Sequence, residues 1–279
     1  AQLAVQPGAQ PERLRVGDLI GRDQIGAQGQ EAVQGLAQHP LGGAELEQRR
    51  TNTIGGTVAR EAGVQSGTFG PAVGRPIIRG LEGARVQVLQ SGVSSLDVST
   101  VSADHAVTIE PFLADQIEIL KGPSTLLFGS GAIGGVVNMV DGRIAEAPVE
   151  GFGGRAELHG NTVNNERAGM VRLDAGNGAA AMHVDYVRRD GDDFDLPDGS
   201  LLNSAIDQKS GAAGAGYASD AGFLGVSFSR YDSLYGIPLG PSNAEPEAGE
   251  EAEEIRLDQE QTRVDVRGGI YSPWTWLDK

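Results

Sequence analysis

Residues 116–129 read QIEILKGPSTLLFG, and residues 134–140 read GGVVNMV. Each segment contains an apolar, β-branched run of strand length that is bounded by Gly, Pro or Asp. Two further runs, at residues 77–78 and 86–89, have the same character. Such runs are typical of short strands joined by tight turns. The chain up to about residue 142 is therefore predicted to be a small α+β unit.

Helix is expected to be a minor component. Of the 279 residues, 42 are glycine, which is roughly twice ordinary usage. The best candidates for a helical or turn segment are Gln28–Gln38 and Ala114–Leu120. No stretch approaches the ~18 to 20 apolar residues that a membrane-spanning helix needs, so a membrane protein of this sequence must cross with strands. There is no cysteine, which excludes disulfides, thiolate zinc sites and cysteine nucleophiles.

The formal charge of −16 is concentrated in two stretches. Residues 190–207 carry six acids and no base, and residues 245–260 carry eight acids and one base. The remainder is close to neutral. Nucleic-acid binding requires a basic face, so this distribution argues against it. Cations are the more plausible ligands for the two acidic stretches.

Residues 129–134, GSGAIG, match the G-x-G-x-x-G pattern of dinucleotide-binding enzymes. That pattern has meaning only where a helix follows and presents its N-terminus to the pyrophosphate. Here Val136–Val140 follows, which is a poor helix and a good strand. The glycines are better explained by tight turns and close backbone packing. A soluble dinucleotide enzyme stays as an alternative that requires a helix after Gly135.

From Gly151 onward the pattern changes to long segments in which apolar and polar residues alternate. In one of them Met182, Val184 and Tyr186 oppose His183 and Asp185. Period-two alternation over about ten residues indicates strands with one apolar and one polar face. The connections alternate between tight turns, at residues 176–178 and 219–222, and the two long acidic stretches.

Short turns at one end and long loops at the other are typical of a transmembrane β-barrel. A soluble antiparallel sandwich would also alternate, and the pattern by itself does not separate the two. In the last segment Ile255 and Leu257 are apolar at odd positions, whereas Val264 and Val266 are apolar at even ones. A bulge near Gln259–Thr262, or an extension of the strand beyond the membrane, would account for the change of parity.

The segments quoted at the start, together with RPIIRGL at residues 75–81, resemble the plug domain of TonB-dependent outer-membrane receptors. The resemblance implies a flexible N-terminal segment at residues 1–12 that includes a possible TonB-contact region, a plug domain at 13–147, and about six strands of an incomplete 22-stranded barrel at 148–279. It further implies a bacterial outer-membrane receptor in contact with lipid, whose plug is accessible from the periplasm. Import would be energised by TonB with its ExbB/ExbD complex. No enzymatic activity, catalytic residue or cofactor is implied, and a chain of this length is not expected to transport by itself.

A narrower resemblance is to the zinc-uptake (ZnuD-like) branch. It is carried by Asp104-His105-Ala106, by Asp141-Gly142-Arg143-Ile144, and by Tyr235-Gly236-Ile237-Pro238 before an acidic loop. The resemblance implies that Asp104 and His105 are metal ligands and that zinc is the transported ligand. Imidazole and carboxylate suit Zn²⁺ where no thiolate is present. The alternative is a receptor for a siderophore-type metal chelate or another organic ligand.

The acidic loop departs from the branch pattern, because relatives often carry histidines there and this loop has none. Four of its acids, Glu250, Glu251, Glu253 and Glu254, are candidates for attracting cations. A solvated loop without a specific ligand is the competing interpretation.

Charged residues on the polar parity of the strands are expected to face a wet lumen. They include Arg263, Asp265 and Arg267, for which Arg75, Arg79 and Glu118 in the plug are the predicted partners. His159 and His183 share that parity and are expected to be hydrogen-bonded wall residues.

Overall fold

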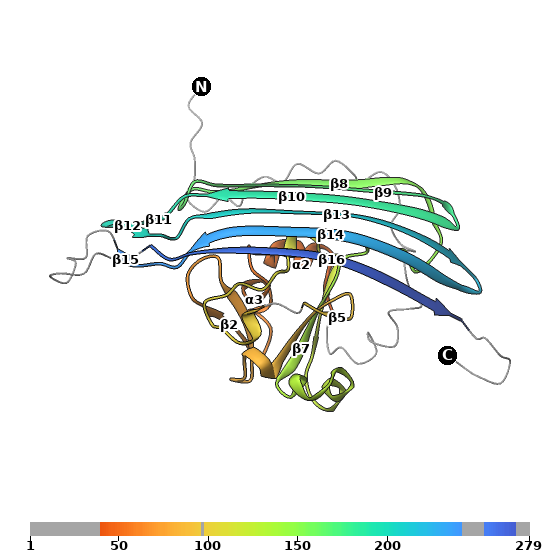
Figure 1. Ribbon diagram of the computed structural model, residues 1–279, viewed down its shortest axis with the longest axis horizontal. Coiled ribbons are helices and arrows are strands. Elements are labelled where there is room, and N and C mark those ends of the chain that lie inside the picture. Colours follow the sequence, from red (N-terminus) through yellow and green to blue (C-terminus); the bar gives the residue numbers. More distant parts are fainter. Residues whose placement is uncertain (1–39, 96–97, 242–253, 272–279) are drawn as a thin grey trace, which may run out of the picture.

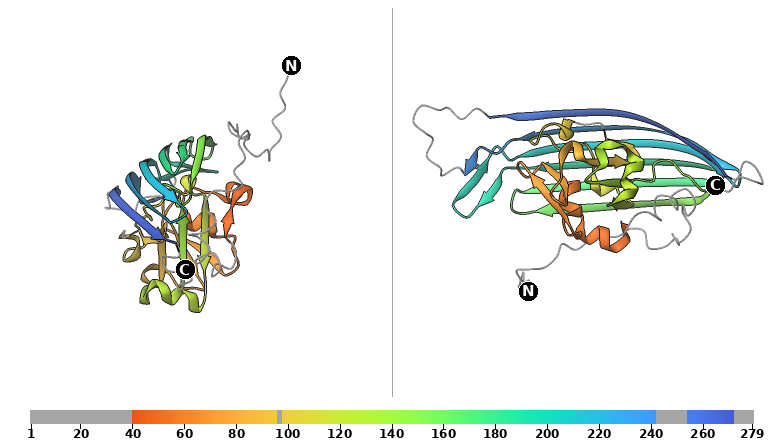
Figure 2. Two further views of the ribbon diagram at one scale, coloured as in Figure 1. Left: turned by 90° about the vertical axis from the view of Figure 1, so that its right-hand side faces the viewer. Right: turned by 90° about the horizontal axis from the view of Figure 1, so that it is seen from below.

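The computed structural model describes residues 40–95, 98–241 and 254–271. Six long strands form one arched layer, and a smaller N-terminal domain lies against its inner face (Figures 1 and 2). We call the layer the wall. In the described residues, no helix has the length and apolar character needed to cross a membrane.

The wall is one antiparallel sheet in which strands that follow each other along the chain are neighbours. Its order is β8-β9-β10-β13-β14-β16. The strands are β8 (Val149–Asn161), β9 (Glu166–Gly178), β10 (Ala180–Gly191), β13 (Ile206–Ser219), β14 (Gly222–Gly236) and β16 (Arg256–Ile270). The predicted tight turns join β9 to β10 and β13 to β14, which confirms both.

The wall exposes its apolar face and buries its polar face, whereas a soluble sandwich does the reverse. Met182, Val184 and Tyr186 on β10 are 65%, 50% and 47% exposed, whereas His183 and Asp185 between them are buried. A sandwich would bury the apolar parity in its dry interior. An apolar outer face and a polar inner face are instead the pattern of a membrane barrel wall.

The N-terminal domain is built around a five-stranded sheet of order β1-β6-β7-β4-β5. Its strands are β1 (Leu41–Gly42), β4 (Val86–Gln90), β5 (Val93–Ser94), β6 (Gln116–Leu120) and β7 (Gly135–Val140). A separate hairpin consists of β2 (Val64–Thr68) and β3 (Gly74–Ile78). The helices are α2 (Gly43–Arg49) and α3 (Ile54–Val58), with short 3₁₀ turns η1 (Gly83–Arg85), η2 (Val98–Thr100), η3 (Pro111–Leu113), η4 (Pro123–Phe128) and η5 (Ser130–Ala132).

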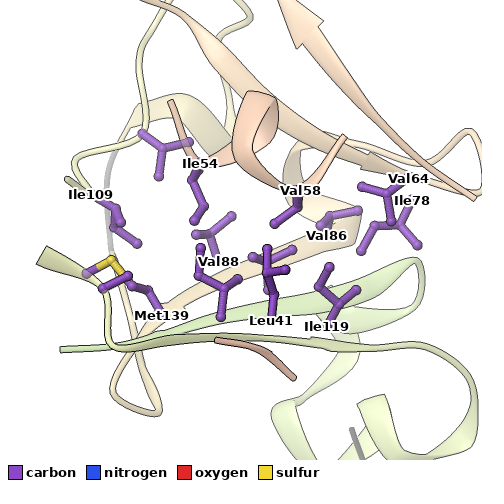
Figure 3. Packing of buried hydrophobic residues seen from close by; sticks show 14 of the residues in the cluster. Leu41, Ile54, Val58, Val64, Ile78, Val86, Val88, Ile109, Ile119 and Met139 are labelled. Carbon is purple, nitrogen blue, oxygen red and sulfur yellow. The ribbon is translucent and has the colours of Figure 1, made fainter. Parts of the chain in front are cut away.

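The core of this domain is apolar. Ile54 and Val58 of α3 share one buried cluster with strand residues such as Ile78, Ile119 and Met139, each of which is at most 3% exposed (Figure 3). Burial of this kind contributes about 25 cal/mol per Å² of apolar surface. The domain is therefore held together mainly by side chains from the strand runs quoted first.

The structure contradicts the dinucleotide hypothesis. Residues after Gly134 form β7, a fully buried strand, and not a helix. A Cβ on Gly134 would lie 2.8 Å from both the Arg85 carbonyl oxygen and the Leu81 Cβ, so the glycine permits close packing. Gly129 has a φ of 92°, a backbone conformation that favours glycine.

Two further expectations about local structure are tested. Ala114–Leu120 is not helical, because Gln116–Leu120 is strand β6. No bulge interrupts the described pairing of β14 with β16, which runs one to one from Gly222 and Ile270 to Gly236 and Arg256. Leu257 keeps the inward parity because it packs against an apolar cluster that includes Tyr235. Gln28–Gln38 lies outside the described residues.

The first acidic stretch is more ordered than a loop. It contains the hairpin of β11 (Phe194–Leu196) and β12 (Gly199–Leu202), and β12 pairs with β15 (Gly240–Pro241). The Asp193 carboxylate accepts hydrogen bonds from the backbone N–H groups of Asn203, Ser204 and Ala205. Part of the negative charge therefore serves to close this turn. The small sheet lies at the long-loop end of the wall (Figure 1).

Candidate functional site

Asp104 and His105 lie in a turn of the N-terminal domain at the long-loop end of the wall. The Nδ1 atom of His105 is 2.9 Å from the Asp104 carboxylate, which also accepts a hydrogen bond from Ser102. These two hydrogen bonds, from Ser102 first and His105 second, lower the pKa of Asp104 below its ordinary value. An ionised carboxylate can only accept, so Nδ1 is the donor of this hydrogen bond, and Nε2 is the ring nitrogen that stays available to a metal ion.

The turn is fastened to the wall by Tyr235 of β14. The Tyr235 hydroxyl accepts from the backbone N–H of Ala106 at 2.8 Å and donates to the carbonyl of Asp104 at 3.2 Å. Gln259 of β16 donates to the Ala106 carbonyl at 3.4 Å. The residues on either side of His105 are thus held by two wall strands.

The described residues contain no group of three or more His, Asp or Glu that could hold a metal ion. Asp104 and His105 therefore do not form a complete metal site in this part of the chain. Glu254 is exposed and pairs with Arg256. Glu250, Glu251 and Glu253 lie outside the described residues, as does the predicted TonB-contact segment at 1–12.

A buried ionic cluster joins the domain to the wall near the short-turn end. Arg143, on the segment that leads from β7 to β8, donates to Asp185 of β10 at 2.8 Å. His183 lies 2.8 Å from both Asp174 and Asp185. Arg172 of β9 pairs with Asp115 at 2.7 Å. We call this set of six residues the inner ionic cluster.

Asp141 begins the same connecting segment. Burial raises the pKa of its carboxyl, but the charge of Arg143 and the hydrogen bond from Gln90 outweigh that effect, so the pKa is lowered from its ordinary value. Asp141 also accepts from Ser91 at 2.9 Å. The start of the connecting segment is therefore tied to the domain as well as to the wall.

A second ionic cluster lies closer to the long-loop end. Arg189 of β10 is 1% exposed and pairs with Glu166 at 2.8 Å and with Glu110 of the domain at 3.3 Å. Gln208 of β13 also hydrogen-bonds Glu110. Arg50 of the domain pairs with Glu157 of β8 at 3.0 Å. We call this set of six residues the outer ionic cluster.

The predicted partners of the wall charges are wrong. Arg263 pairs with Asp265 on its own strand and donates to the carbonyl of Gln90, and Arg267 pairs with Glu146. Arg75 pairs with Glu82 inside the domain, and Arg79 has a positive φ of 51° after strand β3.

Glu118 also stays within the domain, where it accepts hydrogen bonds from Asn138 and Gln116. Burial raises its pKa above the ordinary value despite these hydrogen bonds. The alternation predicted correctly that the charges on β16 lie on the inward face of the wall. Their partners depend on how the N-terminal domain lies against the wall.

The expected hydrogen bonds are found for His183, whereas the contact that the structure shows for His159 is aromatic. His183 belongs to the inner ionic cluster, and His159 makes an edge-to-face contact with Phe112 at 5.9 Å between ring centroids. The sequence reasoning missed the roles of Arg172, Arg189 and Tyr235. The sequence feature that could have indicated these roles is the alternation of apolar and polar residues, which places all three on the inward face of their strands.

A hollow of about 730 Å³ lies between the domain and the long-loop end of the wall. It is lined from the domain by Asn52 and Phe112, from the wall by His159, and from the loops by Phe194 and Pro238. Its lining mixes aromatic, amide and imidazole groups with the charged side chains of Arg50, Glu166 and Arg189.

Residues 37–136 match the model of the TonB-dependent Receptor Plug Domain family. The N-terminal domain is therefore similar to a TonB-dependent receptor plug domain, and we call it the plug from here on. The wall has the fold of the barrel strands that follow such a plug. The plug-and-barrel fold predicted from the sequence is thereby confirmed.

Solved structures of the same fold include a copper transporter and an iron transporter. The copper transporter OprC matches 81% of this chain with a TM-score of 0.63 at 17% identity, and 32% of OprC is covered. The FrpB iron transporter from Neisseria meningitidis (F3-3 variant) matches 85% with a TM-score of 0.64 at 13% identity, and 39% of it is covered.

The siderophore receptor PirA from Acinetobacter baumannii matches 76% of the chain with a TM-score of 0.57 at 18% identity, and 34% of PirA is covered. The chain therefore spans about a third to two fifths of the length of these structures. They are transporters and receptors, and their likeness to this chain concerns the fold.

Proposed function

We propose that the receptor containing this chain imports a metal ion, zinc by preference, across the outer membrane with energy supplied through TonB and its ExbB/ExbD complex. The observation that carries the proposal is the Asp104–His105 pair. The carboxylate holds Nδ1 of the imidazole at 2.9 Å, which is how proteins orient a histidine whose other nitrogen binds a metal. In this geometry Nε2 of His105 would coordinate the metal, and Asp104 orients the ring. Further ligands would come from outside the described residues.

The plug–wall contacts support a transport cycle in which the plug rearranges. They include many hydrogen bonds and ion pairs, such as Arg143–Asp185 and Glu110–Arg189, beside two small apolar clusters. Polar partners regain hydrogen bonds from water when they separate in a wet lumen. TonB would pair with a segment near the N-terminus by β-strand addition.

A metal chelate is the second candidate ligand, and the hollow at the long-loop end favours it. Its volume of about 730 Å³ is far larger than a bare ion needs and falls within the ~300–1,000 Å³ range of small-molecule sites. The transporters and receptors of similar fold are described as acting on copper, iron or siderophores. The two candidates differ in whether His105 contacts the metal directly.

The test compares two ligands on the purified full-length receptor. Zinc binding is measured by calorimetry and binding of a ferric siderophore by fluorescence quenching, for the wild type, His105→Ala and His159→Ala. His159 is a matched control for zinc binding only, because it contacts Phe112 and not the Asp104 turn but lines the hollow assigned to the chelate. The proposal predicts that His105→Ala weakens zinc binding at least tenfold, because it removes a ligand, and that His159→Ala does not. Zinc binding that is unaffected by His105→Ala, together with tight siderophore binding, would overturn the zinc proposal in favour of the chelate.

A further inference from the structure

Tyr235, at the long-loop end of the wall, is buried and also makes specific hydrogen bonds to the plug. Its side chain is 1% exposed, yet its hydroxyl contacts the backbone on both sides of His105. A phenol hydroxyl has one proton and two lone pairs. It therefore satisfies the Ala106 N–H and the Asp104 carbonyl at the same time, across about 130 residues of sequence.

The ring of Tyr235 is held by a small apolar cluster. Ala72, Val73 and Ala106 of the plug and Ile206 and Ile237 of the wall side pack in this cluster, with Leu257 against it. Close packing of this kind leaves a buried ring one rotamer. The position of the hydroxyl is consequently fixed relative to β14.

The direction of the His105 ring depends on the backbone that Tyr235 holds. The ring is attached to Asp104 through Nδ1, and Asp104 is in turn the residue whose carbonyl Tyr235 binds. Removing the hydroxyl would leave the Ala106 N–H and the Asp104 carbonyl without this partner and let the turn shift. The Asp104–His105 hydrogen bond does not itself anchor the turn to the wall.

We propose that Tyr235 is a positioning residue for metal binding, which fixes the backbone on both sides of His105 and thereby the direction in which Nε2 is presented. The inference rests on the proposed function, since it assumes that His105 binds the metal. It also gives a physical link between ligand and wall, because the same turn that would hold the metal is bonded to β14.

Tyr231 provides a matched control on the same strand. It is also buried, at 7% exposure, and its hydroxyl hydrogen-bonds Ser233. Tyr231→Phe therefore removes the same atom from the same strand, four residues away, without touching the Asp104–His105 turn. A loss of stability that occurs in both Tyr235→Phe and Tyr231→Phe can therefore be separated from the effect of Tyr235→Phe on zinc binding.

The experiment measures zinc affinity of the purified full-length receptor, and zinc uptake by cells, for wild type, Tyr235→Phe, Tyr231→Phe and His105→Ala. Tyr235→Phe is expected to weaken zinc binding about tenfold, the lower end of what loss of a residue supporting a metal ligand costs. It is expected to raise the half-saturation concentration of uptake while leaving the maximal rate unchanged. A residue with a purely structural role would lower the maximal rate through loss of folded receptor.

The outcomes separate the inference from the proposal on which it rests. If His105→Ala weakens zinc binding and Tyr235→Phe behaves like Tyr231→Phe, the positioning role is wrong and the zinc proposal stands. If His105→Ala leaves zinc binding unchanged, both are wrong, whatever Tyr235→Phe does. Weakening by His105→Ala and Tyr235→Phe, with Tyr231→Phe at the wild-type value, supports both.

Discussion

The interior of the plug and its interface with the wall differ in their share of charged residues. The interior is apolar, with residues such as Ile54, Ile117 and Val137 almost fully buried. The interface contains the two ionic clusters, in which Arg189 and Asp185 are at most 3% exposed. Apolar burial stabilises a fold without specifying a partner, whereas a charge pair is strong only when both partners are in place. The plug therefore has an apolar core of its own, and charge pairs join it to the wall beside two smaller apolar clusters.

The largest expected effect comes from placing a charge in the interior. Val137→Asp buries a carboxylate among apolar side chains, and the free energy of unfolding of the plug should fall by about 5 kcal/mol or more. Hydrogen exchange of β4, β6 and β7 amides in the full-length receptor measures this. The control is Val101→Asp, because Val101 is 82% exposed, and it should change the free energy by less than about 0.5 kcal/mol. Equal protection in the two variants would show that the plug interior is not the source of its stability.

The next effect tests the interface. Arg189→Met leaves the carboxylates of Glu110 and Glu166 without their shared guanidinium, which should lower the stability of the contact by about 3 kcal/mol. Hydrogen exchange should increase in the segment around η3 and much less in β7. Adding Glu110→Gln should recover part of the loss, because it removes one of the two unpaired charges.

The same pair of variants can refute the distinction between the regions. If Arg189→Met loosens β7 as much as η3, the interior and the interface form one cooperative unit. If Glu110→Gln adds to the damage instead of reducing it, the unpaired charge is not the cause.

A smaller effect depends on pH. Burial raises the pKa of Glu118 above its ordinary value, so the group contributes stability that is present below the ordinary pKa and is lost as the pH rises through the raised value. Urea midpoints of the wild type and Glu118→Gln should therefore differ in a pH-dependent way, with the wild type gaining relative to the variant as the pH falls. A difference that is constant, or that changes with the opposite sign, would contradict this account of Glu118.

The smallest effect is expected for an ion pair on the outer face of the wall. Arg188 and Asp207 are 44% and 46% exposed in their side chains, and exposed pairs contribute about 0.2–1 kcal/mol. Arg188→Ala should lower the urea midpoint of the receptor only slightly. A loss as large as that of Arg189→Met, on the adjacent residue with the opposite orientation, would mean that burial is not what separates the two.

Alternation and apolar runs predicted most of the strands, because strand formation depends on residues that are close together in the sequence. The alternation at residues 182–186 gave the two faces of β10, and the β-branched run at 136–140 gave β7. The error at Ala114–Leu120 has a local cause too, because residues 117–120 form the same kind of apolar run as the other strands. The predicted bulge failed because period-two reasoning assumes that inward residues are polar. Leu257 faces inward and finds an apolar cluster that only the plug completes.

The interface lay beyond prediction from the sequence, since each pair joins residues far apart in the chain. Glu110 and Arg189 are separated by 79 residues, and Arg143 and Asp185 by 42. Their contacts require the position of the plug within the wall, which no spacing encodes. The Asp104–His105 pair was recognised from a resemblance, and the structure adds the hydroxyl of Tyr235 and leaves the metal itself as a proposal.

The measurement that tests the account most directly is zinc uptake by cells that express the full-length receptor, with and without TonB. We expect saturable uptake that requires TonB, and a higher half-saturation concentration with an unchanged maximal rate for His105→Ala. Uptake that continues without TonB, or that keeps its half-saturation concentration after His105→Ala, would contradict the account.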